Sequence, residues 1–172
     1  MSHYASNHYR YNTIFENRKM IELNNPIPEF SAQATSETTI TDKSLKGKNV
    51  VIYFYPKDST PGCTTEGQEF RDNIDAFNDA NTVILGVSKC SMKKHENFKA
   101  KQCFPFELIS DPDEVFCKLF DVIKLKKLYG KEYMGIERST FLFDTTGILK
   151  KEWRKVKVKG HVAEVLEASQ AL

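Results

Sequence analysis

Two short apolar segments dominate the hydropathy pattern of the chain. Residues 50–55 and 82–87 are apolar almost throughout and rich in β-branched and aromatic side chains, without the alternation of a half-exposed strand. Such runs are typical of strands that are covered on both faces. Residues 61–80, between them, have the length and polarity of a helix. The spacing therefore predicts a strand–helix–strand unit with parallel strands.

The remaining pattern predicts further elements of both kinds, each with its own start or turn signal. The order predicts an α/β fold with a central mixed β-sheet flanked by helices. The expected elements are an extended piece near Phe30, helices at residues 91–102 and from Asp111-Pro112, strands at residues 139–144 and 148–158 around a turn at Thr145-Thr146-Gly147, and a C-terminal amphipathic helix carrying Val162, Val165, Leu166 and Leu172.

Length and composition narrow the class of protein. The 172 residues amount to about one domain, and 40% of them are hydrophobic. The longest apolar run is far shorter than the ~20 residues of a membrane-spanning helix. A formal net charge of +2 does not indicate nucleic-acid binding. Residues 1–19 lack the apolar stretch of a signal peptide. We therefore expect a cytoplasmic protein, with a flexible extension at 1–19 ahead of one domain at 20–172.

The four cysteines form no recognisable pair. Cys63, Cys90, Cys103 and Cys117 contain no C-x-x-C motif, which argues against a zinc knuckle and against a dithiol redox motif. The four histidines have no metal-ligand spacing with each other or with the cysteines. We therefore expect no metal or other cofactor, and each cysteine has to be interpreted by its own surroundings.

Cys63 occupies a position with unusual electrostatics. It follows the apolar run 50–55, and sites in α/β sheets form where parallel strands end. Thr60 suits the N-cap of the following helix and Pro61 its first position, so Cys63 falls in the first turn. The unpaired N–H groups and the positive end of the helix dipole stabilise a thiolate there. We therefore expect a reactive thiol rather than a packing residue.

The same stretch resembles a known family. Pro56-x-x-x-Thr60-x-x-Cys63 matches the active-site signature of the peroxiredoxins, which are thiol peroxidases with a thioredoxin-like fold. The longer string from Phe54 to Thr64 resembles the bacterioferritin comigratory protein, or peroxiredoxin Q, subfamily. The resemblance covers residues 20–172 through further motifs in the same order: Phe70-Arg71-Asp72-Asn73, Leu85-Gly86-Val87-Ser88, Ser110-Asp111, Tyr129-Gly130-Lys131, Gly135 to Phe141 and Trp153 to Lys157.

The resemblance implies a role for four residues. Cys63 resembles the peroxidatic cysteine, whose thiolate attacks the peroxide O–O bond and becomes a sulfenic acid. Thr60 resembles the threonine that hydrogen-bonds the thiolate and the peroxide oxygen. Arg138 resembles the arginine that keeps the sulfur anionic and stabilises charge developing on the peroxide. Pro56 resembles the proline that shields the sulfur from water.

The resemblance also implies the reaction partners. The substrates would be hydrogen peroxide and organic hydroperoxides, and the reductant would be thioredoxin, glutaredoxin or a similar thiol donor. It implies a monomer, and neither nucleic acid nor membrane is expected as a partner.

The chain departs from the subfamily at the cysteine that resolves the sulfenic acid. Gln68 and Lys99 occupy the two positions at which members carry it. Cys90 is expected at the same sheet edge as Cys63, while Cys103 is expected ~20 Å further along a helix. A disulfide requires the two Cα atoms to come within ~7 Å. Cys90, Cys103 and an external thiol in a one-cysteine mechanism remain the alternatives.

Other features are interpreted as structural. Cys117 lies at the edge of an apolar helical face and is expected to be inert. Glu66, Glu69 and Arg71 are interpreted as surface charges of a helix, with Glu66 close enough to influence Cys63. The alternating Lys155 to Lys159 segment predicts a strand with one exposed face rather than an anion-binding surface.

Two rival functions compete with peroxide reduction. A thioredoxin-fold binding or redox-sensing protein without peroxidase turnover would keep the fold, although it need not keep Pro56, Thr60, Cys63 and Arg138 together. A disulfide oxidoreductase would need a vicinal dithiol at the active turn, which Gly62-Cys63-Thr64-Thr65 lacks.

Overall fold

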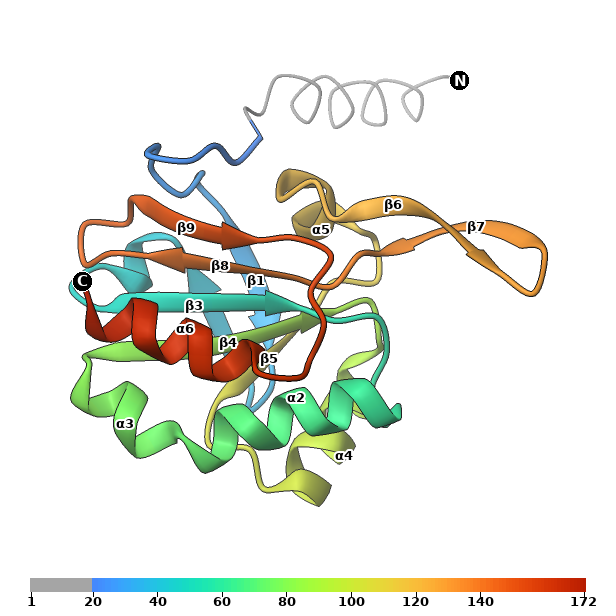
Figure 1. Ribbon diagram of the computed structural model, residues 1–172, viewed down its shortest axis with the longest axis horizontal. Coiled ribbons are helices and arrows are strands. Elements are labelled where there is room, and N and C mark those ends of the chain that lie inside the picture. Colours follow the sequence, from blue (N-terminus) through green and yellow to red (C-terminus); the bar gives the residue numbers. More distant parts are fainter. Residues whose placement is uncertain (1–19) are drawn as a thin grey trace, which may run out of the picture.

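A seven-stranded mixed β-sheet runs through the centre of the molecule (Figure 1). The computed structural model describes residues 20–172, so the flexible extension predicted at 1–19 lies outside the described residues. The strand order is β2-β1-β5-β4-β3-β8-β9. The strands are β1 (Ser31–Ala34), β2 (Thr38–Thr41), β3 (Asn49–Phe54), β4 (Thr82–Ser88), β5 (Glu107–Ser110), β8 (Ser139–Phe143) and β9 (Leu149–Trp153).

Helices connect and cover the strands, and a separate two-stranded hairpin projects from the body. None of the helices within residues 20–172 is long and apolar enough to span a bilayer. The remaining elements are the 3-10 helix η1 (Lys43–Leu45), the helices α2 (Pro61–Asp72), α3 (Ile74–Asp79), α4 (Met92–Gln102), α5 (Val115–Leu119) and α6 (His161–Gln170), and the hairpin strands β6 (Ile123–Leu128) and β7 (Lys131–Ile136).

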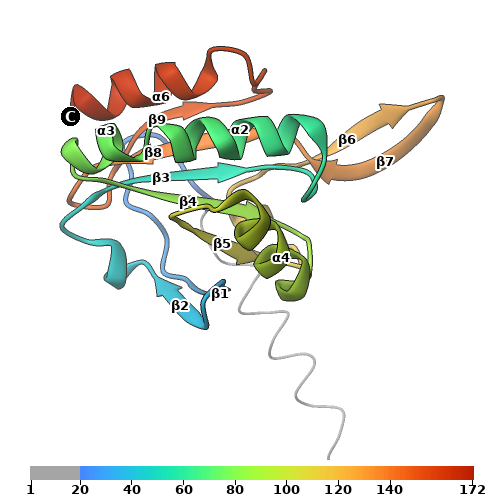
Figure 2. The same cartoon turned by 90° about the horizontal axis from the view of Figure 1, so that it is seen from below.

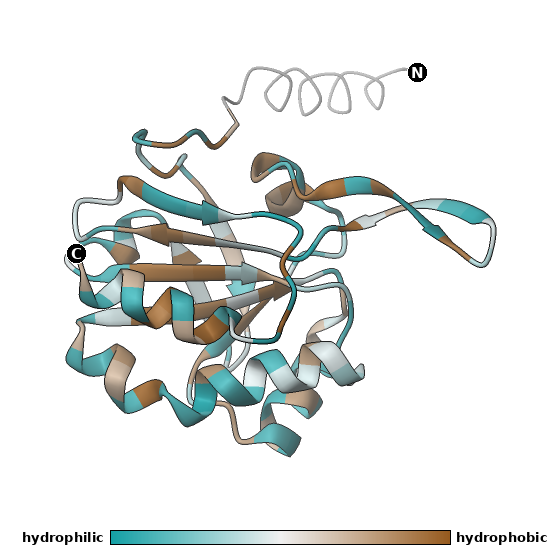
Figure 3. Cartoon of the chain, in the orientation of Figure 1, coloured by the Kyte–Doolittle hydropathy of each residue, from teal (hydrophilic) through white to brown (hydrophobic). Residues whose placement is uncertain are grey.

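Strand β3 is covered on both faces, as its continuous apolar run predicts. Val50, Ile52 and Phe54 belong to one hydrophobic cluster, which includes side chains of α5. The alternate residues Val51 and Tyr53 belong to a second cluster, with side chains of α2, α3 and α6. Figure 2 shows α2, α3 and α6 together on one side of the sheet, and Figure 3 shows that the central strands are apolar. The predicted α/β architecture, a central mixed sheet flanked by helices, is confirmed.

Two predicted helix boundaries differ from the structure. The helix expected at residues 61–80 divides at Asn73 into α2 and α3. The helix expected from Asp111 begins at Val115, because a turn and a left-handed Glu114 intervene. Asp111 still caps that helix, since its carboxylate accepts the N–H groups of Phe116 and Cys117.

The strand predicted over Lys155–Lys159 is wrong. Strand β9 ends at Trp153, and Lys155 has a φ of 49°, which takes the backbone out of the extended region. The segment turns toward the site instead, where the N–H of Val156 donates to the carbonyl of Arg138 at 2.9 Å. An alternating pattern alone does not make a strand when the backbone has no neighbouring strand to pair with.

The sheet topology decides which chain segments meet at one edge. Strands β3 and β4 are parallel, so the segments that follow Phe54 and Val87 emerge together. Strand β8 is antiparallel to β3, with Ser139 opposite Phe54. Arg138, which directly precedes β8, therefore lies at the edge where β3 ends and α2 begins.

Candidate active site

The loop from Tyr55 to Thr60 delivers Cys63 to the first turn of α2. Thr60 has extended dihedral angles as the N-cap residue and Pro61 is the first helical residue, which confirms the predicted helix start. The first helical bond joins the N–H of Thr64 to the carbonyl of Thr60 at 2.9 Å. The Cys63 side chain is buried, and its sulfur lies at the positive end of the helix dipole.

Arg138, which directly precedes β8, contacts the sulfur of Cys63. Its Nη2 lies 3.3 Å from Cys63 Sγ, and its Nη1 lies 2.7 Å from Glu66 Oε1. A β-carbon at Gly62 would stand 3.2 Å from the same Nη2, so glycine leaves room for the guanidinium. A fixed cation at hydrogen-bond distance favours the thiolate over the thiol.

Glu66 is not a surface charge, and this part of the sequence interpretation is wrong. Its side chain is fully buried, and among the described residues its Oε2 has no hydrogen-bond partner. Burial raises the pKa of the carboxyl to about 7, although the Arg138 guanidinium opposes the shift. A signal was available, because Cys63, Glu66, Gly67 and Phe70 form the buried face of α2 at helical spacing.

The raised pKa of Glu66 predicts a pH dependence of stability. The protonated carboxyl is favoured in the folded state, so its contribution is fully present below the unfolded value of 4.5 and is lost as pH rises through about 7. We expect the unfolding free energy of the wild type, relative to Glu66→Gln, to fall by roughly 3 kcal/mol from about pH 4 to about pH 8. Urea unfolding across this range measures the difference. Parallel pH profiles for the two proteins would contradict it.

Thr60 and Pro56 belong to the loop that precedes Cys63, and the hydroxyl of Thr60 bonds to a loop carbonyl rather than to the sulfur. The hydroxyl of Thr60 donates to the carbonyl of Lys57 at 2.7 Å, which closes the loop ahead of the helix. Pro56 is half-buried and directly follows the buried Tyr55. The structure places both residues at the entrance to α2, and the roles assigned to them rest on the resemblance.

The four cysteines are all free thiols in different surroundings. Cys117 is buried, and burial followed by the charge of Asp111 raises the pKa of its thiol strongly, which agrees with an inert residue. Cys103 is exposed at the end of α4, in a left-handed conformation with φ 53°. Cys90 is partly buried after β4, and its sulfur accepts the N–H of Asp58 at 3.4 Å.

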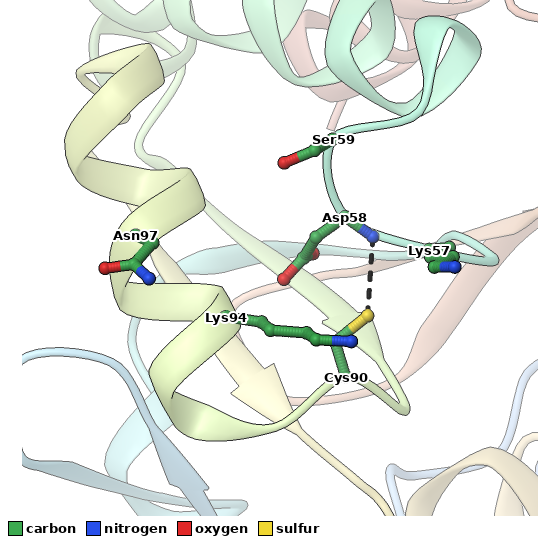
Figure 4. A pocket seen from close by; sticks show the side chains of 6 residues that line it. All are labelled: Lys57, Asp58, Ser59, Cys90, Lys94 and Asn97. Atoms are coloured by element: carbon green, nitrogen blue, oxygen red, sulfur yellow. Dashed lines mark hydrogen bonds between the residues drawn. The ribbon is translucent and has the colours of Figure 1, made fainter.

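Cys90 opens onto a cavity beside the active-site loop (Figure 4). The cavity has a volume of about 250 Å³ and is also lined by Lys57, Asp58, Ser59, Lys94 and Asn97. Three of these residues belong to the loop that precedes Cys63. Cys90 therefore lies beside the loop that leads to Cys63, at the sheet edge where it was expected.

The two positions at which subfamily members carry a resolving cysteine are engaged in other contacts. Gln68 Nε2 donates to Gln102 Oε1 at 2.9 Å, which links α2 to the end of α4. Lys99 forms an ion pair with Glu107 at 2.7 Å. Arg71, interpreted from the sequence as a surface charge, is partly exposed and also donates to the carbonyl of Gln102 at 2.8 Å.

Comparison with known proteins gives consistent matches. The model of the AhpC/TSA family matches residues 23–152. The peroxiredoxin Bcp of Bacillus subtilis is 52% identical over 147 residues, 86% of this chain and 94% of that protein. The peroxiredoxin Bcp of Xanthomonas campestris is 55% identical over 134 residues, 78% of this chain and 84% of that protein.

Solved structures agree with the sequence matches. A structure of the Xanthomonas campestris bacterioferritin comigratory protein, studied for alkyl peroxide reduction, has a TM-score of 0.79 at 51% identity and covers 83% of this chain and 90% of that one. A Cys→Ser mutant of the Xylella fastidiosa peroxiredoxin Q has a TM-score of 0.83 at 41% identity, covering 89% of this chain and 98% of that one. The fold is thus the predicted thioredoxin-like one.

Proposed function

The chain belongs to the AhpC/TSA family and is a peroxiredoxin, a thiol-dependent peroxidase, and on that premise we propose that Cys63 is its peroxidatic cysteine. The observation that carries the proposal is the 3.3 Å contact between Arg138 Nη2 and Cys63 Sγ at the start of α2. The helix dipole and the guanidinium act on the sulfur together, and both favour the thiolate.

The first half-reaction follows from this geometry. The Cys63 thiolate attacks one oxygen of the peroxide, the O–O bond breaks, and the sulfur becomes a sulfenic acid. The other oxygen leaves as hydroxide or alkoxide and takes a proton to become water or an alcohol. Arg138 stabilises the charge that develops on the oxygens. The Thr60 hydroxyl rotates away from the Lys57 carbonyl and donates its hydrogen bond to the sulfur or to the bound peroxide. Pro56 limits access of water to the sulfur.

The substrates and reductant form a further part of the proposal. The related Xanthomonas protein has been studied for alkyl peroxide reduction, which supports organic hydroperoxides beside hydrogen peroxide as substrates. We propose thioredoxin, or glutaredoxin in its place, as the thiol donor of a monomeric enzyme in the cytoplasm. Residues 20–172 would form the catalytic domain.

Cys90 is the resolving cysteine that the contacts favour. Its sulfur already touches the backbone of Asp58, in the loop that leads to Cys63. Cys103 lies beyond the C-terminus of α4 and is exposed. In the second half-reaction the Cys90 thiol attacks the sulfenic sulfur of Cys63, water leaves, and a disulfide forms. The loop has to move for the two Cα atoms to come within ~7 Å.

Mass spectrometry after one equivalent of hydrogen peroxide tests this assignment. We expect a Cys63–Cys90 disulfide in the wild type and in Cys103→Ser, because both retain the two thiols. In Cys90→Ser we expect a sulfenic acid at Cys63 that dimedone traps. A Cys63–Cys103 bridge would assign resolution to Cys103. Sulfenic acid alone in the wild type would establish the one-cysteine mechanism, and an unmodified Cys63 would refute its peroxidatic role.

A further inference from the structure

His95 of α4 is fully buried and uses both ring nitrogens. Nε2 lies 2.9 Å from the carbonyl oxygen of Ile109, and Nδ1 lies 2.6 Å from Asp58 Oδ2. A carbonyl oxygen accepts hydrogen bonds and cannot donate them, so Nε2 carries a proton. The number of protons that His95 and Asp58 share then depends on the contact between Nδ1 and Asp58 Oδ2.

A second proton lies between His95 and Asp58. Without it, the lone pair of Nδ1 would face a carboxylate oxygen at 2.6 Å between two buried side chains, and two acceptors do not make such a contact. The other carboxylate oxygen, Oδ1, accepts the hydroxyl of Tyr55 at 2.6 Å. Burial raises the pKa of Tyr55 well above its usual range, so this phenol remains a donor. The side chains of Asp58, His95 and Tyr55 thus form a fully bonded buried network.

This network anchors the loop that leads to Cys63. Ser59, between Asp58 and Thr60, has a φ of 60°, a left-handed conformation that is strained for a residue with a β-carbon. The loop therefore needs stabilising contacts both before and after Ser59. After Ser59, Thr60 and Pro61 start α2. Before it, the Asp58 side chain bonds to Tyr55, which directly follows β3, and to His95 of α4, while its N–H donates to Cys90 Sγ (Figure 4).

We propose that Asp58 and His95 are positioning residues of the peroxidase reaction. This inference rests on the proposed function of Cys63. Neither residue touches the reacting sulfur in the structure. They act through the loop, which holds Thr60 and Cys63 opposite Arg138. Peroxide reduction needs all three groups in register, whereas alkylation of Cys63 needs only an accessible thiolate. Comparing the oxidation rate of Cys63 with its alkylation rate therefore distinguishes an effect on the positions of these groups from an effect on the ionisation of the thiol.

Three variants with distinct effects on the network form the test. Asp58→Ala removes both side-chain bonds and leaves His95 and Tyr55 without their partner. Asp58→Asn can keep every bond, because its amide nitrogen donates to Nδ1 and its amide oxygen accepts the Tyr55 hydroxyl. Asp144→Ala is the matched control: it deletes an aspartate that accepts bonds from Thr146 and Ile148 at the opposite edge of the sheet.

The measurements are the second-order rate of Cys63 oxidation by hydrogen peroxide, the rate of Cys63 alkylation by iodoacetamide, and the melting temperature. In Asp58→Ala we expect oxidation about 10- to 100-fold slower and alkylation changed less than about threefold. Asp58→Asn should oxidise within about threefold of the wild type. Asp144→Ala should melt earlier and oxidise at the wild-type rate.

Several results would overturn the inference. The first is a wild-type oxidation rate in folded Asp58→Ala, and the second is an equal loss of the oxidation and alkylation rates in that variant. The third is an Asp58→Asn variant that is oxidised as slowly as Asp58→Ala, and the fourth is an Asp144→Ala variant that is slowed to the same extent. If Asp58→Ala does not fold, Tyr55→Phe replaces it in the test. We then expect oxidation to slow by at least about threefold while alkylation is unchanged, and a wild-type oxidation rate in Tyr55→Phe would overturn the inference. A wild type whose Cys63 does not react with peroxide would instead refute the proposed function.

Discussion

Peroxide turnover is expected to fall to the uncatalysed rate when Cys63 is replaced by serine. A serine hydroxyl stays protonated at neutral pH even beside Arg138, and the variant has no sulfur at the start of α2 to accept an oxygen atom. Loss of the nucleophile from an enzyme that works through a covalent intermediate lowers turnover by roughly 10⁴-fold or more. Peroxide consumption with a thiol donor in excess measures it.

Cys117→Ala is the matched control for this prediction. Cys117 is buried in the hydrophobic cluster on the other face of β3 from Cys63, and its thiol pKa is strongly raised, so we expect near wild-type turnover with a loss of about 1 kcal/mol in stability. Turnover in Cys63→Ser would show that another thiol carries the reaction. Inactivity of the wild type with thioredoxin, glutaredoxin and small thiols would favour the redox-sensing alternative.

Replacing Arg138 with glutamine is expected to slow Cys63 oxidation by roughly 10²- to 10³-fold. The guanidinium is the charged donor at 3.3 Å from the sulfur, and removing one such donor from a charge-stabilising site typically has this effect. Stopped-flow measurement of the reaction with hydrogen peroxide gives the rate. A rate within about threefold of the wild type would contradict a role for Arg138 in the reaction.

The same substitution also leaves Glu66 buried without its ion-pair partner. Arg138 opposes the rise in the pKa of Glu66, so without the guanidinium the buried carboxyl stays protonated at neutral pH and becomes an unpaired charge only at higher pH. Arg138→Gln alone is therefore expected to unfold more readily than the wild type as pH rises above about 7. The double variant Arg138→Gln/Glu66→Gln removes the buried carboxyl, and with it the loss of stability at higher pH. We expect it to recover most of the stability while remaining as slow with peroxide, which separates the chemical role of Arg138 from its structural one.

Local patterns made much of the fold predictable. Continuous apolar runs mark β3 and β4, because a strand covered on both faces cannot place polar side chains on either. The hairpin of β6 and β7 was not predicted. Its strands pair only with each other and leave large apolar side chains exposed, Leu125 and Met134 among them, so they lack the buried face that gives a strand its pattern.

Sequence alone determined the position of Cys63, because an N-cap threonine and a first-turn proline act within a few residues of the sulfur. Only the tertiary structure decided which groups surround it. Arg138 lies 75 residues from Cys63 in the chain and reaches it because β8 runs antiparallel to β3. Asp58 and His95 lie 37 residues apart and meet through the packing of α4. Such contacts leave no periodic signal in a single sequence, since they depend on strand order and packing rather than on neighbouring residues.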